Sequence, residues 1–119
     1  MKLYRVMKVA ADGKPLVGIR FGMLGVRPRN PTTTFDVDAV AGTDLVHPGE
    51  GLSTSPDPNS RQPRRGESVF EIETDELSPD LAPNPDKPGH VLLEPSRSMT
   101  LDDFQQALAD TRDLWQQVQ

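Results

Sequence analysis

The sequence predicts an α+β protein in which short strands are joined by long proline-rich loops and followed by one amphipathic helix. Three observations support this fold class. Several short stretches alternate between apolar and polar side chains, which is the period of a half-buried strand. The 12 prolines concentrate between those stretches. Near the C-terminus, apolar side chains instead recur at helical spacing behind a capping sequence.

The N-terminal segment predicts a β-hairpin. In Met1–Ala10 (MKLYRVMKVA) every second side chain falls on the same side of an extended chain, so these residues are the first predicted strand. Asp12 and Gly13 follow it and form a typical hairpin turn. Pro15–Phe21 (PLVGIRF) is the second predicted strand, and the proline- and threonine-rich segment after it ends the regular structure.

The middle of the chain alternates between short strands and long loops. We predict a short strand at Gly51–Ser55 and a surface loop at Pro56–Gly66, which holds three prolines, three arginines and no apolar side chain except those prolines. Ser68–Thr74 (SVFEIET) predicts a strand with its carboxylates outward. Asp75–Gly89 contains four prolines and is predicted as another loop, and His90–Glu94 (HVLLE) as a short strand.

The last element is a predicted helix over Leu101–Gln117. Thr100 precedes it as the N-cap, and Asp103 stands at the position that a capping box uses. Met99 and Phe104 occupy the two positions of a hydrophobic staple. The side chains that form the apolar stripe are Leu101, Phe104, Ala107, Leu108, Thr111, Trp115 and Val118.

Composition excludes several classes of protein. The chain has 119 residues, which suits one domain spanning 1–119, and its net charge of −5 argues against broad nucleic-acid binding. The absence of cysteine excludes disulfides, thiolate nucleophiles and zinc–thiolate sites. No run approaches the roughly 18 apolar residues of a membrane span, so no membrane insertion is expected. The N-terminus shows no typical signal peptide.

Most of the chemistry-bearing residues have an ordinary structural interpretation. His47 and His90 are far apart in the sequence and lack metal-ligand spacing, so no metal site is expected. Ser53 and His90 could be combined with an aspartate as a hydrolase triad, but the Gly-x-Ser-x-Gly elbow is absent. The arginines of the loop Pro56–Gly66 can bind a phosphate or an acidic partner, although solubilising charges are the favoured interpretation. Glu94 ends an apolar strand beside a loop, where functional residues often lie.

One ordered set of motifs is more specific. Leu-Tyr-Arg ends at Arg5, the strand Gly-Leu-Ser-Thr-Ser holds Ser53, Thr54 and Ser55, and a later strand ends at Glu94. This resembles the order Arg, Ser-Thr-Ser, Glu of many mono-ADP-ribosyltransferases. In that family the arginine holds a phosphate or ribose of NAD, the Ser-Thr-Ser strand shapes the nicotinamide pocket, and the glutamate stabilises an oxocarbenium-like transition state. A guanidinium suits a pyrophosphate, and a fixed carboxylate suits a ribosyl cation.

The resemblance extends over most of the chain. Together with Leu3–Arg5, the segments Met23–Arg27, Gly51–Asp57, Val69–Leu81 and Gly89–Leu108 are similar to the small bacterial type VI secretion NAD-dependent cytotoxin family. The resemblance implies an ADP-ribosyltransferase-like fold with a split antiparallel sheet core, NAD as substrate, and a cognate immunity protein as partner. The residues implied to bind NAD are Arg5, Arg27, Ser53, Thr54, Ser55 and His90. Arg5 and Glu94 are the implied catalytic residues.

The function that we predict is therefore a toxin-like protein that binds NAD and transfers ADP-ribose to a cellular target. We expect it in the cytoplasm, or as a secreted effector acting in the cytoplasm of a target cell. The main alternative is a catalytically silent interaction module of the same fold, which binds a protein through Pro56–Gly66 or the helix stripe. A relative of RNA 2′-phosphotransferases, which also use NAD, is a third interpretation, but paired basic residues for RNA phosphate are not evident.

Overall fold

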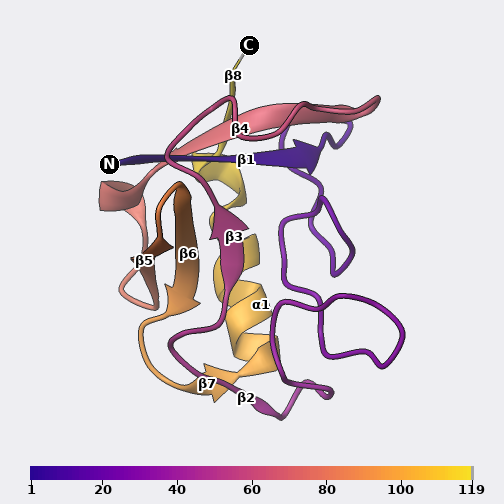
Figure 1. Cartoon of the computed structure of the whole chain (residues 1–119), viewed down its shortest axis with the longest axis vertical. Helices are drawn as coiled ribbons and strands as arrows, with labels where there is room; N and C mark the ends of the chain where they lie inside the picture. Colours follow the sequence, from indigo (N-terminus) through magenta and orange to yellow (C-terminus); the bar gives the residue numbers. More distant parts are fainter. Residues whose placement is uncertain (119) are drawn as a thin grey trace.

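The computed structural model describes residues 1–118, and they form a mixed α+β fold of mostly antiparallel sheets with one α-helix near the C-terminus (Figure 1). This confirms the predicted fold class. The strands and helix, in chain order, are β1 (Lys2–Lys8), β2 (Leu45–Val46), β3 (Leu52–Thr54), β4 (Glu67–Glu73), β5 (Leu81–Lys87), β6 (His90–Pro95), β7 (Met99–Thr100), α1 (Leu101–Ala109) and β8 (Gln116–Val118). Two 3₁₀ turns lie at Thr74–Glu76 and Arg112–Leu114.

The sheet is split into separate pieces. Its two larger parts have the strand orders β1-β4-β8 and β3-β6-β5, and β2 pairs with β7 in a smaller ribbon. Figure 1 shows β1 and β4 lying across one end of the molecule, with β3 and β6 running away from them. The two larger sheets meet at Tyr4 and Ser55, whose backbone N–H groups each donate to the other residue's carbonyl at 2.7 and 2.9 Å. This junction brings β1 beside β3.

The core lies between the sheets and α1. Phe70 of β4, Phe104 of α1 and Trp115 are fully buried there. The indole N–H of Trp115 donates to the hydroxyl of Thr111 at 3.0 Å, so the one polar group of this side chain is satisfied inside the core. Within residues 1–118, no helix has the length and apolar character that crossing a lipid bilayer requires.

The predicted hairpin at the N-terminus is wrong in its second strand. Pro15–Phe21 contributes only isolated bridges, in which Pro15 pairs with Val9 and Val17 with Leu24. The chain bends sharply at Gly22, whose φ of +77° lies in the left-handed region that favours glycine. The segment therefore folds back on itself instead of extending along β1.

The predicted loop Asp75–Gly89 is also wrong, because Leu81–Lys87 forms β5 in spite of Pro83 and Pro85. This strand is at the edge of its sheet, paired only with β6 among the described strands. The backbone nitrogens of two prolines separated by one residue face the same side of a strand, and neither nitrogen carries a hydrogen that could be donated. An edge strand tolerates them there, because that side needs no partner.

The predicted helix Leu101–Gln117 is wrong in length, since α1 ends at Ala109. Its start is as expected, with the Thr100 side chain accepting from the Asp103 N–H at 3.1 Å. At the other end the Thr111 hydroxyl donates to the Leu108 carbonyl at 2.6 Å, which competes with the helical ladder. The chain then passes through a 3₁₀ turn and joins β4 as β8.

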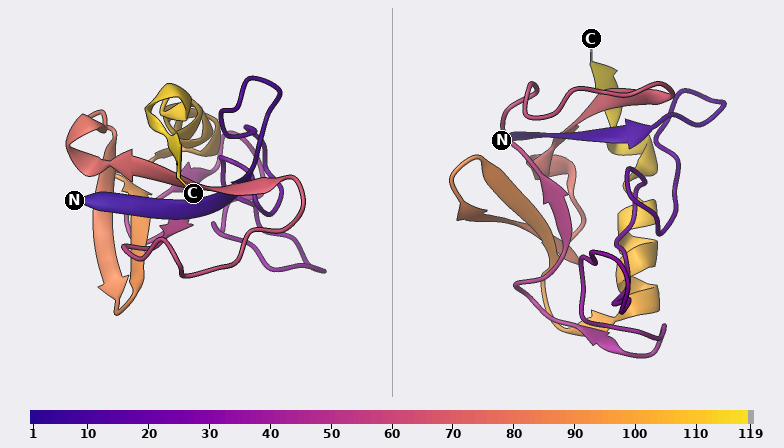
Figure 2. Two further views of the ribbon diagram at one scale, coloured as in Figure 1. Left: turned by 90° about the horizontal axis from the view of Figure 1, so that it is seen from above. Right: turned by 45° about the vertical axis from the view of Figure 1, so that its right-hand side comes forward.

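The long segment between β1 and β2 is anchored along α1 (Figure 2). The Gln105 side chain donates to the Val26 carbonyl at 2.7 Å and accepts from the Val26 N–H at 2.9 Å. The Asp102 N–H donates to the Gly42 carbonyl at 3.0 Å. Val26 and Val37 are both fully buried, so this irregular segment supplies part of the core. Its anchoring also fixes Phe21 and Gly22 beside β1.

Candidate functional site

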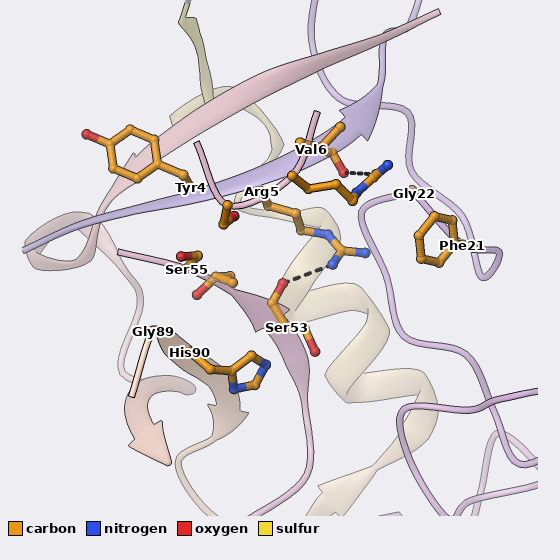
Figure 3. A pocket seen from close by; sticks show the side chains of 12 residues that line it. Tyr4, Arg5, Val6, Phe21, Gly22, Ser53, Ser55, Gly89 and His90 are labelled. Atoms are coloured by element: carbon orange, nitrogen blue, oxygen red, sulfur yellow. Dashed lines mark hydrogen bonds between the residues drawn. The ribbon is translucent and has the colours of Figure 1, made fainter. Parts of the chain in front are cut away.

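A cavity of about 260 Å³ opens where β1 meets β3 and the start of β6 (Figure 3). Five of the residues predicted to bind NAD line it together, namely Arg5, Ser53, Thr54, Ser55 and His90. They come from three strands that are far apart in the sequence. The fold therefore brings together side chains that the sequence placed only in order along the chain.

Arg5 crosses the floor of this cavity. Its Nη1 donates to the Ser53 carbonyl and its Nη2 to the Met23 carbonyl, each at 2.9 Å. In Figure 3 the guanidinium of Arg5 lies above Ser53, and Phe21 lies to its right. Because both contacts are to neutral backbone groups, the positive charge of Arg5 is held in place without being neutralised.

The electrostatics of Arg5 are unusual for a cation inside a protein. Among residues 1–118 it forms no salt bridge, and its buried Nε has no hydrogen-bond partner. Burial lowers the pKa of Arg5 to about 10, against attraction from Asp36 and together with repulsion from Arg61 and Arg27. The group remains charged at neutral pH. Arg5 is partly buried, and a cation that is largely desolvated without a counter-ion is costly, so the site favours an anionic ligand.

The hydroxyl groups of β3 form one wall. Within β3, Ser53 is exposed and Thr54 is buried, which is the alternation of a strand. Ser55, which follows β3, is buried as well, because the chain there pairs with Tyr4 of β1. The Thr54 hydroxyl donates to the Val91 carbonyl at 2.6 Å, and the Ser55 hydroxyl accepts from the Asp57 N–H at 3.0 Å. Gly51 lets β3 approach β6, because a Cβ at this position would lie 2.1 Å from the Leu93 carbonyl oxygen.

His90 enters the cavity from the start of β6. It pairs with Lys87 across the two-residue turn Pro88-Gly89, where Gly89 has a φ of +73°, as a Pro-Gly turn of type II requires. The Nδ1 atom of His90 is hydrogen-bonded to Asp86 at 2.5 Å. This bond to His90 is the main reason that the pKa of Asp86 is lowered from its ordinary value.

Phe21 and Arg61 also line the cavity, and neither residue was predicted from the sequence to belong to the site. The Arg61 guanidinium lies 5.0 Å from the centre of the Phe21 ring, within range of a cation–π contact. It also donates to the Val6 carbonyl at 3.3 Å and pairs with Glu67 at 3.2 Å. The arginines of its loop were visible in the sequence, but only the fold shows which of them reaches the cavity.

Arg27 and Glu94 are not among the lining residues. Arg27 pairs with Asp36 at 3.2 Å, and its guanidinium lies 5.4 Å from the Phe21 ring, next to the cavity. Glu94 accepts hydrogen bonds from the Gly49 N–H at 2.6 Å and from the Asn84 amide at 3.2 Å. Glu94 lies four residues after His90 along β6, which corresponds to a separation of roughly 13 Å.

The polar lining residues are two arginines, a histidine and several hydroxyl groups, and no carboxylate is among the described ones. The aromatic rings of Tyr4 and Phe21, Val6 and two glycines complete the lining. This combination suits a ligand with negative charge, hydroxyl groups and a flat ring, such as a nucleotide. The described part of the chain holds no cluster of three or more histidine or carboxylate side chains that could bind a metal ion.

Comparison with known proteins agrees with this chemistry. A family model described as "Tse2 ADP-ribosyltransferase toxin" matches residues 1–115. No curated protein and no solved structure matches the chain. Because the family model covers nearly all of the sequence, the chain belongs to the Tse2 ADP-ribosyltransferase toxin family.

Proposed function

We propose that this member of the Tse2 ADP-ribosyltransferase toxin family binds NAD in the cavity and transfers its ADP-ribosyl group to a cellular target. The observation that carries the proposal is the partly buried guanidinium of Arg5, which has no counter-ion among residues 1–118 and whose buried Nε has no hydrogen-bond partner there. This group lies among hydroxyl groups and His90. The diphosphate of NAD is the counter-ion that such a group would favour.

The size of the cavity suggests how a dinucleotide would bind. A volume of about 260 Å³ lies just below the range of roughly 300–1,000 Å³ that is usual for ligand pockets. One half of NAD, the nicotinamide and its ribose, fits a space of this size beside Ser53 and His90. The other half would extend over the rim, where Phe21 and Arg61 offer an aromatic ring and a guanidinium.

The two predicted residues outside the cavity lining keep proposed roles of a different kind. Arg27 is proposed to assist binding from beside Phe21, since the two are 5.4 Å apart. Glu94 stays the predicted stabiliser of the ribosyl cation. Its bond to the Gly49 N–H also supports a role in holding the segment before β3 against β6.

We also propose that residues 1–119 form a single toxin domain, which a cognate immunity protein neutralises. Ile19, Phe21 and Val40 are large apolar side chains that are exposed on the segment between β1 and β2. Phe21 belongs to the cavity lining, so a partner that covers it would also obstruct the cavity. The proposed place of action is the cytoplasm, reached directly or after secretion.

Calorimetric titration with NAD and measurement of released nicotinamide test the proposal. Wild type is expected to bind NAD and release nicotinamide, and Arg5→Met is expected to do neither. Arg97→Met is the matched control, because Arg97 is exposed and paired with Asp80 at 2.7 Å. A wild type that does not bind NAD would overturn the proposal.

A silent interaction module is the second candidate, because no carboxylate is found among the described residues that line the cavity. Such a module would bind NAD or a protein partner without releasing nicotinamide. Expression in a bacterial cytoplasm separates the two functions. Growth arrest that Arg5→Met relieves supports the toxin, whereas harmless accumulation of the wild type favours the module.

A further inference from the structure

We infer that Asp86 is a positioning residue, which fixes the imidazole of His90 so that Nε2 accepts the proton of the hydroxyl group that attacks the ribose. This inference rests on the proposed function, since it assigns the proton transfer of the same site. It concerns Asp86, a residue that neither the motif order nor the cavity lining includes.

A hydrogen bond joins the side chains of Asp86 and His90. Asp86 lies in β5, one residue before the Lys87 that pairs with His90 across the turn, and the Oδ1 and Nδ1 atoms of Asp86 and His90 are 2.5 Å apart. The hydrogen bond to His90 lowers the pKa of Asp86, so this carboxylate is ionised at neutral pH and can only accept. The proton of a neutral imidazole must then be on Nδ1, which leaves the lone pair on Nε2.

The position of the His90 ring determines which of its nitrogen atoms a ligand can reach. His90 lines the cavity and Asp86 does not, so the edge of the imidazole opposite Nδ1 is the edge available to a ligand. In residues 1–118, Nε2 has no hydrogen-bond partner. Figure 3 draws the ring below Ser53, on the same side of Arg5.

No other described lining group can take this proton at neutral pH. Arg5 and Arg61 carry positive charge, and the remaining polar groups are hydroxyls with no carboxylate or second histidine among them. Burial and a hydrogen bond to Glu71 raise the pKa of Tyr4, which keeps that phenol protonated. His90 is therefore the base that the cavity offers.

His47 provides an internal comparison. Its Nδ1 is hydrogen-bonded to the Ser98 hydroxyl at 2.6 Å, away from the cavity. A hydroxyl can donate or accept, so Ser98 does not impose one tautomer on His47. A carboxylate does impose one, and this difference is what separates the two histidines.

Water is the simplest acceptor of the ADP-ribosyl group. The water oxygen forms a bond to C1′ of the ribose, and the bond from C1′ to the nicotinamide nitrogen breaks. The electron pair of that bond stays on the nitrogen, which loses its formal positive charge. The proton of the water moves to Nε2 of His90, and the Asp86 carboxylate stabilises the resulting imidazolium. The products are nicotinamide and ADP-ribose.

Nitrogen NMR of the imidazoles tests the position of the proton without any turnover. We expect the neutral ring of His90 to be protonated on Nδ1 in the wild type and on Nε2 in Asp86→Ala, with His47 unchanged. Asp80→Ala is the matched control, because Asp80 lies just before β5 and pairs with Arg97. A wild-type His90 protonated on Nε2, or a tautomer that Asp86→Ala leaves unchanged, would overturn the inference.

Steady-state kinetics of nicotinamide release test the catalytic part. We expect His90→Ala to lower kcat about 10²–10⁴-fold, as is typical for the loss of a general base. Asp86→Ala should lower kcat by a smaller factor with KM for NAD unchanged, and Asp86→Asn should recover part of the loss because its amide oxygen still accepts from Nδ1. A change in KM alone would contradict the role of Asp86.

The two proposals fail in different ways. A wild type that does not bind NAD overturns the proposed function, whereas the NMR measurement judges the Asp86–His90 pair independently. A wild type that binds NAD but releases no nicotinamide overturns the proton transfer and leaves the binding proposal standing.

Discussion

Replacing Arg5 with methionine should remove ligand binding while leaving the fold intact. Burial lowers the pKa of Arg5 from its ordinary value to about 10. At about 1.4 kcal/mol per pKa unit, holding the charged form in this partly buried position costs at most about 3 kcal/mol. Because this is a base with a lowered pKa, the cost is fully present below pH 10 and disappears only as the pH rises towards the ordinary pKa of an arginine. Methionine removes it at every working pH.

The substitution also removes the bonds to the Ser53 and Met23 carbonyls, which costs about 1–3 kcal/mol if either group is left unpaired. The two effects have opposite signs and similar size. The free energy of unfolding should therefore change by less than about 2 kcal/mol, and the melting temperature by only several degrees. Urea unfolding and thermal melting measure both quantities.

Binding should respond very differently. A bidentate contact between a guanidinium and a diphosphate contributes about 1.5–3 kcal/mol for each hydrogen bond. Its loss weakens NAD binding about 10²–10⁴-fold, since each 1.4 kcal/mol is a factor of ten in affinity. Calorimetry measures this, with Arg97→Met as the control. The reasoning is refuted if Arg5→Met is less stable by more than about 3 kcal/mol, or if it binds NAD with the affinity of the wild type.

Three further substitutions test the scaffold around the site. Gln105→Leu leaves both backbone groups of Val26 unpaired and should lower the free energy of unfolding in urea by about 1–3 kcal/mol; an unchanged midpoint would contradict this. Gly51→Ala places a Cβ 2.1 Å from the Leu93 carbonyl oxygen and should lower the melting temperature by the equivalent of about 1–3 kcal/mol, so a wild-type melting curve would be the contrary result. Burial raises the pKa of Glu67, but hydrogen bonds from Arg64 and Arg61 outweigh this effect, and the net pKa lies below the ordinary value of 4.5. The stability that these hydrogen bonds add is therefore present above pH 4.5 and is lost in more acidic solution. Glu67→Gln should therefore reduce the difference between urea midpoints at neutral and acidic pH, and an undiminished difference would count against this interpretation.

The alternation of apolar and polar side chains and the capping sequence at Thr100 predicted the elements that depend mainly on residues close together in the sequence. The strands around Arg5, Ser53 and His90 were all predicted close to their observed places, because each has an apolar side facing the core. The start of α1 was predicted from Thr100, whose cap is formed by neighbouring residues. Local patterns of this kind depend on few distant contacts, so the sequence alone can show them.

The predictions were wrong where contacts between residues far apart in the sequence determine the local structure. Pro83 is compatible with a strand only because β5 is at an edge, and the edge is a property of the whole sheet. Trp115 fits the helical stripe in sequence, but it enters the core from the extended residue that follows the 3₁₀ turn, and its indole N–H donates to the Thr111 hydroxyl. Similarly, nothing in the sequence distinguishes Arg61 from its neighbours, and the link from Asp86 to His90 exists only once their hairpin forms.

The junction of Tyr4 with Ser55 places the cavity where the two larger sheets meet. Among residues 1–118 the Tyr4–Ser55 pair supplies the backbone hydrogen bonds between these sheets, and Arg5 and Ser53 lie next to it. A ligand that contacts both β1 and β3 would therefore add a further link between the two sheets. The amide protons of Tyr4 and Ser55 should exchange more slowly with solvent when the site is occupied, so two backbone groups report occupancy even where no chemical step takes place.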